Sequence, residues 1–197
     1  MKKNQKGLKM KSKVILDVIV DDDKWVEVVD FDAIKVAQEL KDLTFDYVAE
    51  GGEHELLSKA KELNVNVCLS NDEEVHRLNK EFRGMDKPTN VLSFANIDDD
   101  EFWNNIEDDG EHELGDIILS FETLYQEANE KNISVYAHYC HLLVHGFLHL
   151  LGFDHIENDE AEIMEDLEVE ILSQFSIDNP YKTLNPGLTL LFPTKYF

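Results

Sequence analysis

The sequence has few cysteines and no long apolar run, and each absence excludes a class of protein. Two cysteines in 197 residues cannot build a disulfide framework, so we expect Cys68 and Cys140 to be buried, reduced thiols. No run approaches 18 consecutive apolar residues, which excludes a membrane-spanning helix. The first residues also lack the apolar segment of a secretory signal. These absences favour a cytoplasmic protein.

Basic residues are also scarce, and those present are unevenly placed. Only 18 Lys and Arg stand against 42 Asp and Glu, a formal net charge of −24. Six of the 18 lie within residues 1–13, and no acid precedes Asp17, so the rest of the chain is more acidic still. Because nucleic-acid binding relies on Lys and Arg contacts to phosphates, this composition argues against a general nucleic-acid binder. Contact with RNA would need a local basic spot, the N-terminal lysines or a metal ion.

The remaining composition fits one folded domain. A hydrophobic content of 43% with 30% charged residues is ordinary for a globular protein, and 197 residues suffice for a single core. We expect a basic, flexible tail over residues 1–13, a single domain over 14–180 and an irregular C-terminal tail over 181–197.

The pattern of apolar residues predicts an α+β fold. Runs rich in β-branched or alternating apolar residues predict strands at 14–20, 64–70, 91–94 and 115–120. Helical spacing and capping residues predict helices at 31–48, 71–82, 121–130, 134–151 and 158–175. The acid-rich stretch 98–113 is predicted to be an exposed, mobile loop, because it lacks the alternation of a calcium-binding EF-hand. We therefore expect a small mixed sheet of about four strands with helices packed on it, its last two strands antiparallel.

Residues 145–155, HGFLHLLGFDH, carry the strongest chemical signal. His145 and His149 are four residues apart and share one face of a helix. Gly152 stands where that helix would end and adopts the left-handed conformation cheaply, so the chain can turn back and bring His155 toward the pair. Three imidazoles without an obvious fourth ligand are typical of a catalytic zinc site, which leaves one position for water or substrate. We therefore predict one Zn²⁺ per chain, held by these three histidines.

Several neighbouring residues allow more than one role. His138 and His141 continue the histidine stripe of the predicted helix, beside an apolar arc that would face the core. His141, one turn before His145, suits three roles: a fourth metal ligand, a hydrogen-bond partner of a metal ligand, or a proton carrier. Asp154 fits either a carboxylate that orients an imidazole or a turn residue. Nickel or another imidazole-binding metal suits the same ligands.

The histidine spacing coincides with the pattern H-E-x-x-H-x-x-G-x-x-H of the metzincin peptidases, but one residue differs. Gly146 stands where those peptidases have the glutamate that activates water. Without that base, peptide hydrolysis is disfavoured. Cleavage of a phosphodiester makes a lesser demand, because a metal and a cation can neutralise the phosphate oxygens. A metallopeptidase-like hydrolase stays an alternative.

Three blocks of the sequence resemble the bacterial YbeY family. The run HGFLHLLGFDH is similar to the family signature H-G-x-L-H-L-x-G-[FY]-D-H. A second block is LNKEFRG at residues 78–84, followed by Asp86 and by TNVLSF at residues 89–94. The run LGDI at residues 114–117 matches a third block, so the resemblance covers most of residues 65–175.

This resemblance implies a fold, an activity and a set of site residues. The implied fold is zincin-like, with a three-histidine metal site at the end of a long helix. The implied activity is that of a zinc-dependent, single-strand-specific endoribonuclease acting in ribosomal RNA maturation and ribosome quality control. In this family's pattern His145, His149 and His155 hold the zinc, and Arg83 matches a functionally important arginine of the active-site cleft.

We expect Arg83 and His141 to be catalytic. In so acidic a chain, an arginine on a Gly/Pro loop suits clamping one phosphate, while a surface ion pair is the alternative. His141 is our candidate for the general base, and the resemblance places both it and His138 near the metal. The expected partners are single-stranded or ribosomal RNA and ribosome or small-subunit assembly proteins, with no membrane. A non-catalytic, zinc-stabilised ribosome assembly factor is a second alternative.

Overall fold

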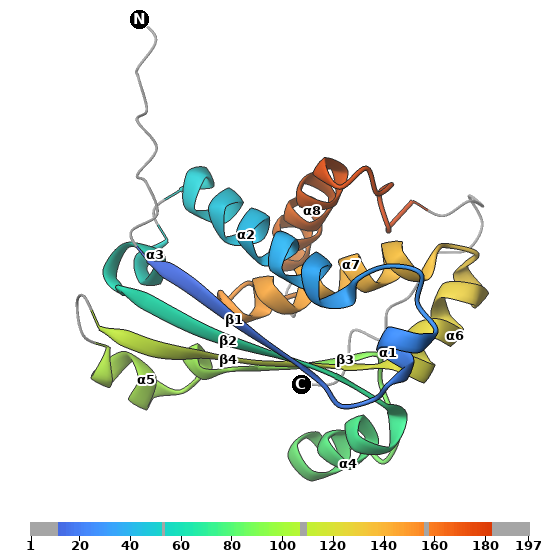
Figure 1. The fold of residues 1–197 in the computed structure, drawn as a ribbon. Coiled ribbons are helices and arrows are strands. Elements are labelled where there is room, and N and C mark those ends of the chain that lie inside the picture. Colours follow the sequence, from blue (N-terminus) through green and yellow to red (C-terminus); the bar gives the residue numbers. More distant parts are fainter. Residues whose placement is uncertain (1–11, 53, 107–109, 156–157, 183–197) are drawn as a thin grey trace, which may run out of the picture.

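A single mixed sheet organises the computed structural model, which describes residues 12–52, 54–106, 110–155 and 158–182. The strand order is β1-β2-β4-β3 (Figure 1). The strands are β1 (Lys13–Val20), β2 (Glu62–Ser70), β3 (Val91–Ala95) and β4 (Glu111–Ser120). β1, β2 and β4 are parallel neighbours, and β3 pairs antiparallel with β4 at the edge. The predicted α+β class, the four strands and the antiparallel pairing are confirmed.

Helices cover the two faces of this sheet unequally. On one face lie α2 (Ala33–Gly51), α7 (Val135–Leu150) and α8 (Asn158–Gln174), and on the other lies α4 (Asp72–Arg83) (Figure 1). The shorter elements are α1 (Lys24–Glu27), α3 (Glu55–Lys59), η1 (Asn96–Asp98), α5 (Asp100–Asn105) and α6 (Phe121–Lys131). Among the described residues, no helix has the length and apolar character needed to cross a bilayer.

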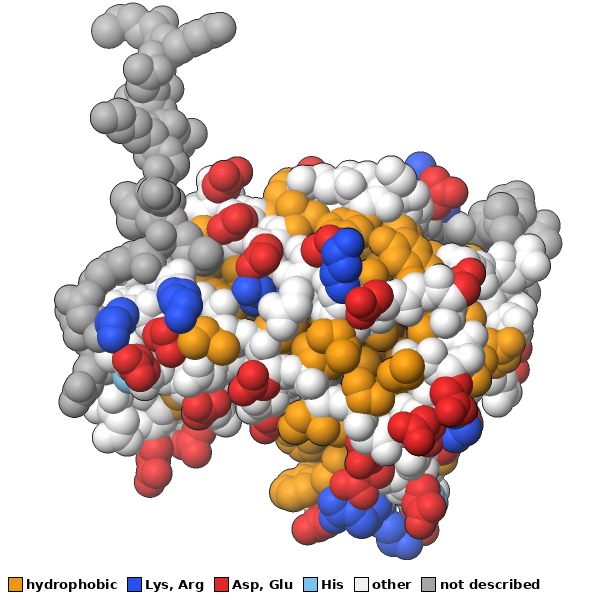
Figure 2. Space-filling model, viewed as in Figure 1, with side chains coloured by type: hydrophobic (Ala, Val, Ile, Leu, Met, Phe, Trp, Pro, Cys, Tyr) orange, Lys and Arg blue, Asp and Glu red, His pale blue; other side chains and the backbone are white. Residues whose placement is uncertain are grey.

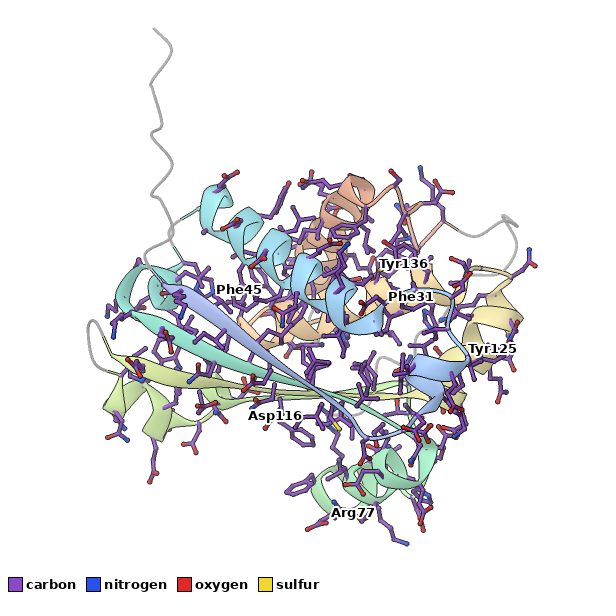
Figure 3. The ribbon with its side chains drawn as sticks, in the orientation of Figure 1. Phe31, Phe45, Arg77, Asp116, Tyr125 and Tyr136 are labelled. Atoms are coloured by element: carbon purple, nitrogen blue, oxygen red, sulfur yellow. The ribbon has the colours of Figure 1, made fainter. Side chains whose placement is uncertain are left out.

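The main core lies between the sheet and the layer of α2 and α7. Alternate residues of β2 are buried there, including Val65 and Val67. Phe45 of α2 lies between its helix and the sheet (Figure 3) and meets Phe147 of α7 edge-on, with ring centroids 6.0 Å apart. Aromatic side chains bury large apolar areas, so these contacts fix α7 firmly over the strands.

One predicted segment is wrong in part. The sequence predicts a loop over residues 98–113, but the structure has the end of η1, α5 and the first residues of β4 there. The Asp99 carboxylate accepts a hydrogen bond from the Glu101 backbone at 2.8 Å and caps α5. Trp103 donates its indole N–H to the Ile97 carbonyl at 2.8 Å. Capping and aromatic contacts thus order part of this acid-rich stretch. Its residues 107–109 lie outside the described residues.

Other predictions fare differently. Cys140 is buried as expected, whereas Cys68 is only half-buried. The predicted tails fall mostly outside the described residues, at 1–11 and 183–197, so their separation from the domain stays a prediction. Lys13, assigned to the N-terminal tail, instead begins β1 and pairs with Glu62 at 3.2 Å. Acidic side chains are spread over the face shown in Figure 2, as the net charge implies.

Candidate metal centre

α7 delivers His145 and His149 to its C-terminal end and then stops abruptly. Ser134 caps its N-terminus by accepting a hydrogen bond from the Ala137 backbone at 3.0 Å. At the other end, Gly152 has a φ of 84°, and its N–H donates to the His149 carbonyl at 2.9 Å. The Phe153 N–H donates to the Leu148 carbonyl at 3.0 Å, which completes a Schellman motif. The predicted glycine turn is confirmed.

This turn brings three imidazoles together. One ligand-type nitrogen from each of His145, His149 and His155 lies within 4.8 Å of the other two. The ring centroids are 4.5 Å apart for His145 and His149, 5.3 Å for His145 and His155, and 5.0 Å for His149 and His155. Within the described part of the chain, these three histidines are the His, Cys, Asp or Glu side chains whose ligand atoms lie close enough together to hold one metal ion.

The orientation of two rings fits a bound cation. The Nε2 atoms of His145 and His149 face each other at 3.1 Å. The opposite nitrogen of His145 contacts the Glu168 carboxylate at 2.8 Å, and the ring of His149 donates to the Phe153 backbone carbonyl. In the neutral tautomer that donates from the opposite nitrogen, each ring presents an Nε2 lone pair toward the same point. Two ligands of a tetrahedral zinc, each at about 2.0–2.1 Å, lie roughly 3.3 Å apart.

The electrostatics favour neutral rings for His149 and His155. Burial, together with the nearby His145 and His155, lowers the pKa of His149 to about 3. Burial also lowers the pKa of His155, again with a contribution from His145. Imidazole binds metals in its neutral form, so His149 and His155 can bind a metal at neutral pH.

Glu168 of α8 is a buried carboxylate that the sequence prediction missed. Its Oε1 accepts from His145 Nδ1 and its Oε2 from His141 Nε2, each at 2.8 Å. The Tyr181 hydroxyl donates to the same Oε2. A signal was present in the sequence, because Glu168 stands four residues from both Met164 and Leu172, on the face that α8 buries. An acidic residue on a buried face needs partners.

Two further predicted residues are now placed. His141 is buried and its ring centroid lies 6.4 Å from that of His145, but its Nε2 points to Glu168. Asp154 accepts a hydrogen bond from the His155 backbone at 2.7 Å, so it acts as a turn residue. Of the two roles considered for Asp154, the structure supports the turn.

Arg83 lies at the last turn of α4, beside the edge strand β3. Gly84, with a φ of 68°, ends that helix in the left-handed conformation. Arg83 Nη2 donates to the Ser93 carbonyl at 2.9 Å, and the guanidinium stands 6.0 Å from the centroid of Phe94. Burial raises the pKa of Asp98, Asp154 raises it further and Arg83 lowers it. Asp98 therefore lies within electrostatic reach of both Arg83 and the turn that carries His155.

Gly146 lies where α7 packs closely against Ile117 of β4. A Cβ at this position would stand 2.9 Å from Ile117 Cδ1 and 3.0 Å from its Cγ2. Real Cβ contacts are longer, so Ile117 would have to shift even for alanine. A glutamate at this position, as in the metzincin pattern, has no space toward the sheet.

Comparison with known proteins agrees with the signature. The family model described as "Endoribonuclease YbeY" matches residues 28–176. The chain belongs to the YbeY family. A relative named Endoribonuclease YbeY from Rhizorhabdus wittichii is 52% identical over 128 residues, which are 64% of this chain and 75% of the relative. The protein of that name from Zymomonas mobilis is 49% identical over 133 residues, 67% of this chain and 76% of the relative.

A solved structure was also found. The solution structure of TM1509 from Thermotoga maritima is 22% identical, covers 88% of this chain and 99% of that chain, and has a TM-score of 0.45.

Proposed function

We propose that this protein is a zinc-dependent, single-strand-specific endoribonuclease of the cytoplasm, acting in ribosomal RNA maturation and ribosome quality control. Its relatives carry the name Endoribonuclease YbeY. The observation that carries the proposal is the convergence of three imidazoles, His145, His149 and His155, on one point. Three protein ligands leave a coordination position for water or substrate, as catalytic zinc sites do.

In this proposal, the zinc would supply a Lewis acid for a phosphoryl oxygen or for an attacking water. Arg83 would bind a non-bridging oxygen of the scissile phosphate and stabilise the charge that develops there. Its hydrogen bond to the Ser93 carbonyl uses Nη2 and leaves further donors of the planar guanidinium for a phosphate. Although the chain has a net charge of −24, one oriented arginine can bind a phosphate at this site without a surrounding basic surface.

His141 remains our predicted general base. Its ring contacts Glu168, which in turn contacts His145, so His141 lies one carboxylate away from the metal cluster. The pH profile of cleavage by a His141→Gln variant tests this role, because loss of a general base removes the acidic limb of that profile. An unchanged acidic limb excludes His141 as the base.

The decisive experiment compares cleavage of one single-stranded RNA by metal-free, zinc-restored and His149→Ala protein, purified in parallel. We expect cleavage by the zinc-restored wild type alone. Activity of equal size in the His149→Ala preparation shows that the cleavage does not depend on the histidine cluster and contradicts the proposal. A peptide substrate in the same assay tests the metallopeptidase alternative, which the close contact of Gly146 with Ile117 disfavours.

Arg83 is tested against a matched arginine on the same helix. Arg77 of α4 is exposed, pairs with Glu74 and Glu81, and lies on the outer side of the helix (Figure 3). We expect Arg83→Ala to lower the cleavage rate on the order of 10²-fold with zinc still bound, and Arg77→Ala to leave it unchanged. Equal rates for both variants remove Arg83 from the mechanism. Zinc binding without any cleavage by the wild type favours the non-catalytic assembly factor.

A further inference from the structure

Glu168 has an environment that packing alone does not explain. Its side chain is almost fully buried, yet it carries a carboxylate. Leaving an ionised carboxylate without partners in such a place costs several kcal/mol. The structure gives it three donors, which are the rings of His141 and His145 and the hydroxyl of Tyr181.

We propose that Glu168 is the positioning carboxylate of the metal centre, which fixes His145 with its proton on Nδ1 and its Nε2 lone pair toward the metal. This inference rests on the proposed zinc site. A neutral imidazole has one N–H, and an ionised carboxylate can only accept, so contact with Glu168 Oε1 places that proton on Nδ1. The remaining nitrogen, Nε2, then faces His149 Nε2 at 3.1 Å.

Glu168 also supplies charge. Three neutral imidazoles leave the two positive charges of a zinc ion uncompensated, and a carboxylate behind one ligand balances one of them and makes that ligand a better donor. The ring of His149 donates to the Phe153 carbonyl, which is a neutral acceptor. The two histidines of α7 are thus oriented by different groups, one by the turn of its own helix and one by α8.

The origin of Glu168 in α8 has a structural consequence. The metal ligand His145 belongs to α7, whereas Glu168 and Tyr181 belong to α8 and the segment that follows it. Zinc binding therefore couples to the docking of α8 on α7 through one buried carboxylate. Amide hydrogens of α8 should exchange more slowly in the zinc-loaded protein than in the metal-free protein.

The test is the zinc affinity of Glu168→Gln, measured by competition with a chromophoric chelator. Glutamine has the same shape, but its single carbonyl oxygen cannot accept from both histidines, so one ring must change its tautomer or lose its partner. We expect a 10- to 100-fold loss of affinity. The matched control is Glu162→Gln, an exposed acid of the same helix, which should bind zinc as the wild type does.

A second measurement requires no variant. Ring nitrogen shifts in the ¹⁵N NMR spectrum of the metal-free wild type report the tautomer of each histidine. We expect His145 to carry its proton on Nδ1. A proton on Nε2 with none on Nδ1 would overturn the inference, even if Glu168→Gln failed to fold.

The two proposals fail in distinguishable ways. If the wild type binds no zinc, the proposed metal site itself is wrong. If the wild type binds zinc and folded Glu168→Gln binds it equally well, the site stands and the role of Glu168 is wrong.

Discussion

α7 contains two histidine–carboxylate pairs that look alike in composition and differ in geometry. His138 contacts Glu127 of α6 at 2.6 Å, and His145 contacts Glu168 of α8 at 2.8 Å. His138 uses Nε2 for its carboxylate, and its buried Nδ1 has no hydrogen-bond partner among the described residues. His145 uses Nδ1 for its carboxylate and presents Nε2 to the histidine cluster.

Both pairs consist of a histidine and a glutamate. What separates the structural pair from the metal-centre pair is which ring nitrogen contacts the carboxylate. Nε2 is the nitrogen farther from the backbone, so a histidine whose Nε2 contacts a carboxylate cannot present that nitrogen to a metal. His138 therefore ties α7 to α6, where Asn90 and Lys131 also contact Glu127. His145 ties α7 to α8 and keeps its outer nitrogen for a ligand.

The largest expected difference between the pairs is in zinc binding. We expect His145→Asn to abolish stoichiometric zinc binding, because two imidazoles do not complete the site. His138→Asn should change zinc affinity by no more than about twofold, since His138 contacts Glu127 and the cluster contacts Glu168, so the two pairs share no carboxylate. Calorimetric titration of both proteins with zinc measures this contrast. A large loss in folded His138→Asn would show that the two pairs form one unit.

The second difference is in acid stability. Burial raises the pKa of Glu127, but hydrogen bonds from His138 and Asn90 outweigh it and lower this pKa to about 2. Because the folded-state pKa lies below the unfolded one, the ionised form stabilises the fold, and this stability is lost as pH falls from about 4.5 to 2. Glu127→Gln should lower the unfolding free energy at pH 7 by on the order of 2 kcal/mol.

Denaturant titrations across this pH range provide the measurement. The stability curves of wild type and Glu127→Gln should converge toward pH 2, while zinc affinity at pH 7 stays unchanged. A constant gap at all pH values would show that the carboxylate is not held ionised by its partners.

The third prediction concerns the approach of α7 to the sheet at its histidine-cluster end. Gly146→Ala forces Ile117 to shift, which costs about 1–3 kcal/mol, while alanine in a helix recovers about 1 kcal/mol. We expect a net destabilisation of about 1 kcal/mol in thermal or denaturant unfolding. Gly51→Ala, at the end of α2, meets nothing within 4 Å and serves as the control, with no loss of stability. A stabilised Gly146→Ala would show that the sheet and helix adapt without strain.

The smallest expected effect is that of Tyr181→Phe. This change removes one of three donors to Glu168 and leaves both histidine contacts in place. We expect a loss of stability of about 1 kcal/mol and a smaller loss of zinc affinity than in Glu168→Gln. Parallel chelator competition on the two variants gives the ranking. The reverse order would assign the orienting role to Tyr181.

The sequence predicts what local geometry dictates. The spacing of His145 and His149, with the Gly152 turn that returns His155, fixes three imidazoles within eleven residues, and the cluster is predicted correctly. Glu168 was missed because it reaches His145 from another helix, at a separation of 23 residues. Likewise, no local pattern indicates that Asp98 lies near Arg83 and Asp154. Long-range contacts depend on how the helices pack, which spacing alone does not encode.

The central claim, an open three-histidine metal centre, is tested most directly by X-ray absorption spectroscopy of the zinc-loaded protein. The account predicts three imidazole nitrogens at about 2.0–2.1 Å and a fourth, oxygen ligand from water. It also predicts that Glu168 stays outside the coordination shell, with its carboxylate on His145 and His141. Four protein ligands, whether a fourth imidazole or a sulfur at about 2.3 Å, would make the site a closed structural one and contradict the account.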